Sequence, residues 1–207
     1  MHFKTQDIAD LDRVLRLKII NSVTGIKPAN LIGTIDKNDI TNLAVFNSVV
    51  HLGSDPALLG FITRPQTDQV GHTLQNIMQT KDYTINHIHP EFTERAHYTS
   101  AKFEKDVSEF KACGLAEEYV DDCSAPFVKE SRFKMGMRFL QAIDMPNKTK
   151  LVVGEIKHVI LRDIDLNDGD INLEQTNSVG ISGLNSYYEL KKIAQYPFVR
   201  INEVPKF

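Results

Sequence analysis

Three short apolar runs joined by two turns occupy residues 29–63 and constrain the fold more than any other part of the chain. The runs cover residues 29–35, 43–50 and 57–63. The connections at 36–39 and 53–56 are rich in Asp, Asn, Gly and Pro, which favour tight turns. Strands joined by such short turns pair antiparallel, because parallel strands need a long crossover connection. The segment therefore predicts a three-stranded antiparallel meander.

The remaining segments add further strands and a few inserted helices. Residues 14–20 alternate apolar and basic side chains, which is typical of a strand. The other expected elements are a short helix at 7–11, a helix at 72–81, a strand at 83–89, two helical pieces within 90–113 that stop at Gly114, strands at 134–143 and 151–163, and a helix at 188–195. Strands and helices do not alternate regularly, so a parallel α/β sheet is not expected. The pattern predicts one domain over residues 1–207, mainly β with inserted helices, built as a closed or partly open antiparallel barrel.

Composition narrows the class of protein. The chain has 207 residues, of which 42% are hydrophobic and 25% charged, with a formal net charge of −3. This balance argues against a nucleic-acid partner and against an anionic membrane surface. The N-terminus has early acids and no apolar signal region, and no apolar run is long enough for a membrane helix, so we expect a cytoplasmic protein. Cys113 and Cys123 show no metal or redox spacing and are expected to be reduced thiols.

Two polar side chains interrupt the second apolar run. Asn47 and Ser48 occupy adjacent positions in the expected strand 43–50, so each faces a different side. A buried amide or hydroxyl must be hydrogen-bonded or it costs about 1–3 kcal/mol. One interpretation is that both side chains satisfy the backbone of a bulge or a loop. The alternative is a flat ligand with heteroatoms along one edge, such as a flavin ring.

A cation, a hydroxyl and an amide gather around the start of the helix expected at 72–81. Arg64 precedes it, Asp68 is expected in the intervening loop, and the first turn at His72 and Thr73 contains no acid, although acids are favoured there. Thr73 and Asn76 share one helix face. The apolar face is expected to contain Leu74, Ile77 and Met78. Helix N–H groups with a nearby arginine favour a phosphate group. The alternative is a surface arginine beside an ordinary helix cap.

Histidines offer a weaker metal hypothesis. The candidate groups are His87 and His89 with His97, or His51 with His72. No acid or cysteine stands at a fixed spacing to complete either set, so no metal site is expected. The chain also lacks the Gly-x-Ser-x-Gly, Walker and Gly-x-Gly-x-x-Gly motifs. A permanent dinucleotide site of the Rossmann type is therefore not expected.

Taken in order, many short segments resemble the flavin-reductase-like proteins that bind FMN in a split barrel. The matching segments are 27–34, 42–50, 53–61, 64–65, 72–77, 83–86, 99–101, 107–110, 153–155 and 183–187. The resemblance implies a Greek-key antiparallel split barrel and a homodimer with FMN near the subunit interface. The implied contacts with the flavin ring are Phe46, Asn47, Ser48 and Val49. The implied phosphate contacts are Arg64, Thr73 and Asn76, and the residues implied to line the pocket are Asn86 and Ser100.

One position departs from this family pattern. Many relatives have Asp before the helix threonine, where this chain has His72. The histidine either adds partial positive charge beside the phosphate, as part of the cofactor site, or is a solvated cap.

The resulting functional hypothesis is an FMN-binding oxidoreductase that takes hydride from NADH or NADPH and passes electrons to an unknown acceptor. Because the cofactor carries the chemistry, no catalytic side chain is named. The alternative is an FMN-binding electron carrier without turnover. A weaker alternative is a split barrel whose pocket is empty or holds haem.

Overall fold

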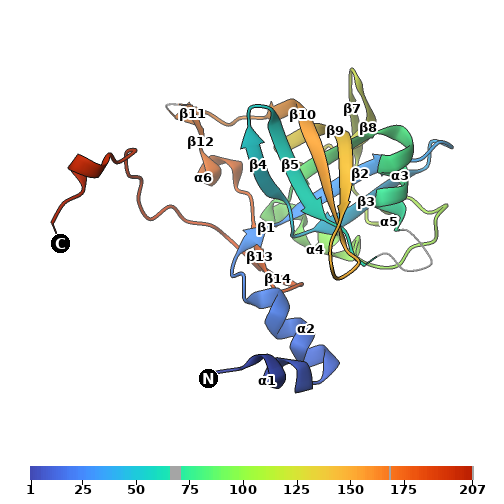
Figure 1. The fold of residues 1–207 in the computed structure, drawn as a ribbon. Helices are drawn as coiled ribbons and strands as arrows, with labels where there is room; N and C mark the ends of the chain where they lie inside the picture. The colour runs from blue at the N-terminus through green and yellow to red at the C-terminus, as the bar shows by residue number, and fades with distance from the viewer. Residues whose placement is uncertain (66–70, 168, 207) are drawn as a thin grey trace.

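A seven-stranded antiparallel sheet forms the body of the protein (Figure 1). The computed structural model describes residues 1–65, 71–167 and 169–206. The strand order is β3-β2-β6-β9-β10-β5-β4, so the first and last strands of the sheet, β3 and β4, are consecutive in sequence. The strands are β2 (Asn30–Ile35), β3 (Thr41–Phe46), β4 (Val50–Ser54), β5 (Ala57–Ile62), β6 (Asp82–His87), β9 (Phe133–Asp144) and β10 (Lys150–Leu161).

Smaller sheets and short helices surround this body. The short strands are β1 (Lys27–Pro28), β7 (Glu117–Val120), β8 (Cys123–Val128), β11 (Leu166–Asn167), β12 (Asp170–Ile171), β13 (Gly180–Ser182) and β14 (Ser186–Tyr188). The helices are α1 (Thr5–Asp10), α2 (Arg13–Ser22), α3 (His72–Thr80), α4 (Thr93–Tyr98), α5 (Glu109–Ala112) and α6 (Leu173–Thr176), with 3₁₀ turns η1 (Pro90–Phe92) and η2 (Ile201–Glu203). β13 pairs with both β1 and β14, so residues 180–188 lie against the strand that follows α2.

Alternation along the strands separates two apolar cores. The first cluster lies on one face of the sheet and includes Ile32, Phe61, Tyr83, Ile85 and Val152. Helix α3 adds Leu74 and Ile77 to this cluster. The second cluster lies on the other face, under α4 and α5, and is formed by Ala29, Leu31, Leu43, Ile88, Phe92, Ala96, Phe110, Leu115, Val128, Val179 and Ile181. Alternate residues of β2 supply both cores, as the two-residue period of a strand requires.

The three-stranded meander expected at residues 29–63 is wrong, because β2 pairs with β3, β5 pairs with β4 and β10, and β3 and β4 lie at opposite ends of the sheet. The structure confirms a mainly β antiparallel architecture. It also confirms helices near 7–11 and 72–81, the long strands β9 and β10, and two helical pieces before Gly114, whose φ is +69°. The strand expected at 43–50 ends at Phe46, however, so Asn47, Ser48 and Val49 form a connection rather than a strand.

Residues 14–20 form helix α2, so the strand expected there is wrong. The Asp12 carboxylate caps the helix by accepting hydrogen bonds from the N–H groups of Val14 and Leu15. The Arg16 guanidinium donates to the Ala9 carbonyl and ties α2 to α1. A good cap and the high helix propensity of Leu, Arg and Lys outweigh a weak alternation.

The helix expected at 188–195 is also wrong, because residues 189–200 have no regular secondary structure and are exposed. A short helix with no surface to pack on is marginal in water. The hairpin of β7 and β8 was missed, although Asp121 and Asp122 mark its turn and Asp122 has a φ of +63°.

Within the described residues, no helix is long and apolar enough to cross a membrane. The thiols of Cys113 and Cys123 are both free.

Candidate functional site

A cavity of about 400 Å³ lies between the C-terminal end of α2 and the connection from β3 to β4. Its lining residues are Ile20, Asn21, Thr24, Lys27, Pro28, Asn47, Ser48 and Val49. Three of the four residues implied to contact a flavin ring therefore share one cavity, and the fourth, Phe46, is their neighbour in sequence. This volume falls within the range of small-molecule sites.

Backbone hydrogen bonds hold the polar side chains of this connection in place. The Ser48 hydroxyl donates to the Ile62 carbonyl at 3.1 Å and accepts from the Ile62 N–H at 3.0 Å, which joins the end of β3 to the end of β5. The Asn47 Nδ2 group donates to the Gly183 carbonyl at 2.8 Å. Both side chains thus bond to backbone, as the first interpretation expected, while the side-chain carbonyl of Asn47 has no partner among the described residues.

Apolar packing at both ends of Asn47–Ser48 also holds this connection in place. The Phe46 and Phe61 rings meet edge to face with centroids 5.0 Å apart. Val49 packs against the same apolar cluster as Phe61. The cavity wall is therefore an extension of the folded core, which limits the ordering that ligand binding requires.

Lys27 adds a positive charge to the cavity, and the sequence assigned it no role. Its Nζ donates to the Asn21 carbonyl at 2.6 Å and to the Gly183 carbonyl at 3.4 Å. Partial burial lowers the pKa of this ammonium group. In the sequence, Lys27 is a lysine just before the first apolar run, and nothing else marks it. Its position in the cavity depends on contacts with Asn21 at the end of α2 and with the distant turn at Gly183.

Helix α3 begins without an acidic residue or a capping side chain. Gly71 is the N-cap, and no acid lies in the first turn. His72 is half-buried, and Arg64 is exposed two residues after β5. These observations fit the predicted phosphate-binding turn, while Asp68 lies outside the described residues.

The polar face of α3 packs against the sheet. The Thr73 hydroxyl accepts a hydrogen bond from the Asn42 amide at 3.1 Å, and the Asn76 amide donates to the Thr34 hydroxyl at 3.1 Å. Both side chains are buried, whereas Met78, expected on the apolar face, is exposed. Because Asn42 donates to Thr73, the Thr73 hydroxyl proton is left without an acceptor among the described residues.

Two residues implied to line the pocket lie elsewhere. Asn86 is fully buried, and its side chain bonds to the Leu31 carbonyl, the Thr84 hydroxyl and the Val128 N–H. Ser100 is exposed just after α4. Neither lines the cavity beside Asn47.

The histidines of the metal hypothesis bond to separate partners. His87 Nδ1 lies 3.0 Å from the Ser178 hydroxyl, and its ring stacks on Phe133. His89 accepts from the Arg132 N–H at Nε2, so its Nδ1 carries the proton and donates to the Asn177 carbonyl. No group of three or more His, Cys, Asp or Glu in the described part of the chain is arranged to hold a metal ion.

Comparison with known proteins shows the family of the chain. Residues 26–175 match the family described as flavin reductase like domain. A protein of Shewanella frigidimarina, assigned as a flavin reductase with a split barrel domain, is 46% identical; the match covers 96% of this chain and 100% of that one, with a TM-score of 0.91.

More distant matches include one solved structure and one protein known by sequence. Nitrilotriacetate monooxygenase component B from Bacillus cereus is 15% identical with a TM-score of 0.84, over 95% of this chain and 98% of that one. An uncharacterized protein of Aquifex aeolicus is 24% identical over 83% of this chain and 87% of its own length. The chain therefore folds as a split barrel and belongs to the flavin reductase like domain family.

Proposed function

We propose that this protein binds FMN and acts as a cytoplasmic flavin oxidoreductase that uses NADH or NADPH. The cavity shared by Lys27 and the Asn47–Val49 connection, in a chain of the flavin reductase like family, is the observation that supports this proposal. When bound, FMN would supply the chemistry by accepting hydride from a nicotinamide and passing electrons to an acceptor. The chain supplies binding, orientation and charge.

The donor set of the cavity fits the edge and the faces of a flavin ring. Asn47 offers an amide carbonyl and Lys27 an ammonium group, which match a pyrimidine edge that has both donors and acceptors. Ile20, Pro28 and Val49 provide apolar surface for the ring body. Ser48 holds the backbone of this wall through its two bonds to Ile62.

The start of α3 is proposed to hold the phosphate. Its first turn presents N–H groups without a competing acid, and the Thr73 hydroxyl proton has no protein acceptor among the described residues. Arg64 and His72 would add positive charge at the same place. Asn76, Asn86 and Ser100 remain proposed contributors, and their placement gives Asn76 and Asn86 a structural role as well.

A visible spectrum followed by anaerobic reduction tests the function. FMN added to the purified protein should produce a bound flavin band near ~450 nm, and NADH or NADPH should bleach it, because hydride transfer reduces the ring. Failure of both nucleotides to bleach a bound flavin would favour an electron carrier. A protein that shows no flavin band after reconstitution would contradict FMN binding.

Arg64→Ala should weaken FMN binding by about 2 kcal/mol, or about 30-fold, while riboflavin binding changes little. The loss requires a phosphate, because within FMN the proposed guanidinium contact is with the phosphate and not with the ring. Fluorescence titration of both ligands measures the difference. Lys157→Ala is the matched control, since Lys157 is an exposed cation on β10 paired with Glu155. Equal losses for FMN and riboflavin would refute the phosphate assignment.

Lys27→Gln should lower the two-electron potential of bound flavin by on the order of 30 mV, because an ammonium group near the ring stabilises the added electrons. Lys27→Arg keeps the charge and should keep most of the potential. Dye-linked anaerobic titration measures the potentials of the three proteins. The same potential in Lys27→Gln and in the unaltered protein would place Lys27 away from the ring.

A homodimer, implied by the family resemblance, is also part of the proposal. α1 and α2 bury none of their residues, although five of the ten residues of α2 are Val, Leu or Ile. Light scattering on the purified protein would determine its oligomeric state.

A further inference from the structure

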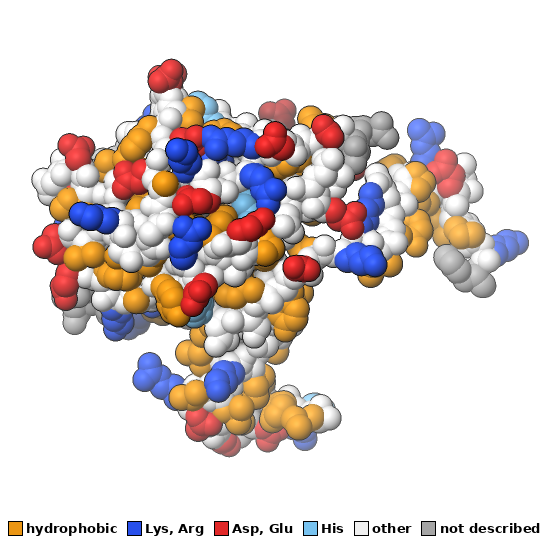
Figure 2. All heavy atoms as spheres, turned by 180° about the vertical axis from the view of Figure 1, so that it is seen from behind, with side chains coloured by type: hydrophobic (Ala, Val, Ile, Leu, Met, Phe, Trp, Pro, Cys, Tyr) orange, Lys and Arg blue, Asp and Glu red, His pale blue; other side chains and the backbone are white. Residues whose placement is uncertain are grey.

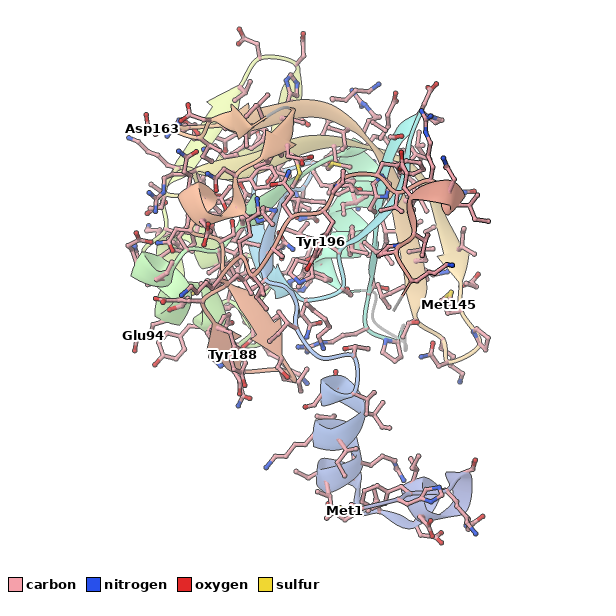
Figure 3. All side chains as sticks on the ribbon, turned by 90° about the vertical axis from the view of Figure 1, so that its left-hand side faces the viewer. Met1, Glu94, Met145, Asp163, Tyr188 and Tyr196 are labelled. Atoms are coloured by element: carbon pink, nitrogen blue, oxygen red, sulfur yellow. The ribbon has the colours of Figure 1, made fainter. Side chains whose placement is uncertain are left out.

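Residues 189–206 form a C-terminal arm that leaves the barrel after Tyr188 (Figure 1). Every residue of the arm is exposed, including Ile193 at 99%, Phe198 at 91% and Ile201 at 94%. Figure 3 looks from the side toward which the arm projects, and Tyr196 lies in front of the barrel there. The arm carries large apolar side chains with no surface of its own chain to cover them.

The exposed area of the whole chain exceeds that of a compact monomer. A folded monomer of 23.4 kDa exposes about 9,700 Å². This chain exposes 13,211 Å², an excess of about 3,500 Å² over that expectation. A permanent dimer buries about 1,000–2,500 Å² from each chain, so the excess is enough for one. Figure 2 shows hydrophobic side chains on both terminal projections.

The barrel has an apolar outer face that can receive such an arm. Val50 pairs with Gly60, which in turn pairs with Val153, and Leu151 pairs with Ile143. A Cβ at Gly60 would meet Leu52 and Leu151, so these leucines lie together over this glycine on the same face. Val50, Leu52 and Ile143 are each more than two-fifths exposed. We call the face formed by Val50, Leu52, Leu58, Ile143 and Leu151 the β4–β5–β10 face.

The sheet edge at this face also needs a partner. β4 is the last strand of the sheet, and among the described strands it pairs with β5 alone. An exposed apolar edge strand is an aggregation hazard unless another segment covers it. Tyr196 and Phe198 alternate along the arm, which is the spacing of side chains on one side of an extended segment.

Charge favours a second copy as the occupant. Residues 189–207 hold four Lys or Arg and two Asp or Glu, whereas residues 27–188 hold sixteen and twenty-two. The arm is therefore net positive and the body net negative, so the arm of one copy and the body of another attract each other. When fully extended, residues 189–206 span at most about 60 Å, enough to cross a neighbouring barrel.

From these observations we infer that two copies exchange their C-terminal arms. The arm of one copy lies on the β4–β5–β10 face of the other, with Tyr196 and Phe198 as its anchors. β4 begins at Val50, directly after the cavity residues Asn47–Val49. The arm of the second copy therefore borders the proposed flavin cavity. This inference rests on the homodimer of the proposed function and adds which segment and which face form the contact.

Charge variants of the arm test its contribution. Phe198→Asp combined with Ile201→Asp should weaken the dimer about tenfold or more, measured by light scattering over a protein dilution series. Both side chains are exposed within one chain, so the barrel should fold normally, which circular dichroism checks. Gln195→Asp combined with Asn202→Asp is the matched control, because it adds the same two charges at exposed polar positions of the arm and keeps its apolar side chains, so it should weaken the dimer less. A double variant that dimerises as well as the control would overturn the inference while leaving the homodimer intact.

Cross-linking locates the contact. Position 198 is replaced by photoreactive benzoylphenylalanine, and the variant is prepared with light and with heavy isotopes. The two preparations are mixed before irradiation, so that cross-links between copies contain one light and one heavy peptide. Cross-links from position 198 to residues 50–58 or 143–151 of the other copy are expected. Cross-links confined to the same chain, or to any other surface, would overturn the assignment. A monomeric unaltered protein would overturn the homodimer as well, whereas FMN binding is judged separately from the spectrum.

Discussion

Asn86→Leu is expected to lower the free energy of unfolding by about 4 kcal/mol, because the leucine cannot replace several buried hydrogen bonds. The Asn86 side chain donates to the Leu31 carbonyl at 3.2 Å and to the Thr84 hydroxyl at 2.9 Å. Its Oδ1 accepts from the Val128 N–H at 2.9 Å. One amide thus joins β2, β6 and β8, and its loss leaves buried polar groups without partners.

Urea unfolding at equal protein concentrations measures this loss, since a dimer makes stability depend on concentration. Asn185→Leu is the matched control, because Asn185 is exposed in the turn between β13 and β14. The control should change stability by no more than about 0.5 kcal/mol. A loss below about 1 kcal/mol for Asn86→Leu would mean that other groups or water replace the amide. FMN titration of the folded variant then separates the structural role of Asn86 from its proposed role in binding.

Local patterns in the sequence were enough to predict the barrel strands and part of the site. The turns at 36–39 and 53–56 indicated the β2–β3 and β4–β5 hairpins, because Asp, Asn, Gly and Pro act within a few residues. The position of these hairpins at opposite ends of the sheet depends on distant strands. The polar pair Asn47 and Ser48 stood out against apolar neighbours, and both line the cavity. The absence of an acid at the start of α3 was likewise visible without a structure.

Features that depend on distant contacts could not be predicted in the same way. The family resemblance implied a pocket role for Asn86, whereas its structural role could not be predicted, because its partners Leu31 and Val128 are far away in sequence. The cavity position of Lys27 depends on the turn at Gly183, and alternation in α2 fitted a strand as well as a helix. Thr73 and Asn76 were expected on a polar helix face, but the hydroxyl of Thr34 and the amide of Asn42 let that face pack on the sheet.

A second large effect is expected at His87, which the sequence offered as a metal ligand. Burial, with a smaller contribution from the nearby His89, lowers the pKa of His87 to about 4. In the unfolded chain, histidine has a pKa of about 6.5. Between these values the unfolded state binds the proton more readily, so stability falls as the pH falls. The loss should reach about 2 kcal/mol between pH 7.5 and pH 5.

Urea unfolding at several pH values between 7.5 and 5 measures this dependence, and His87→Gln isolates it. Glutamine can hydrogen-bond to the Ser178 hydroxyl, which lies 3.0 Å from His87 Nδ1, but it does not titrate. The variant should therefore lose about 2 kcal/mol less than the unaltered protein over this range. His51→Gln is the control, because it makes the same replacement at an exposed position on β4. If His87→Gln keeps the full pH dependence, the proton that destabilises the fold binds elsewhere, and His87 is charged in the folded protein.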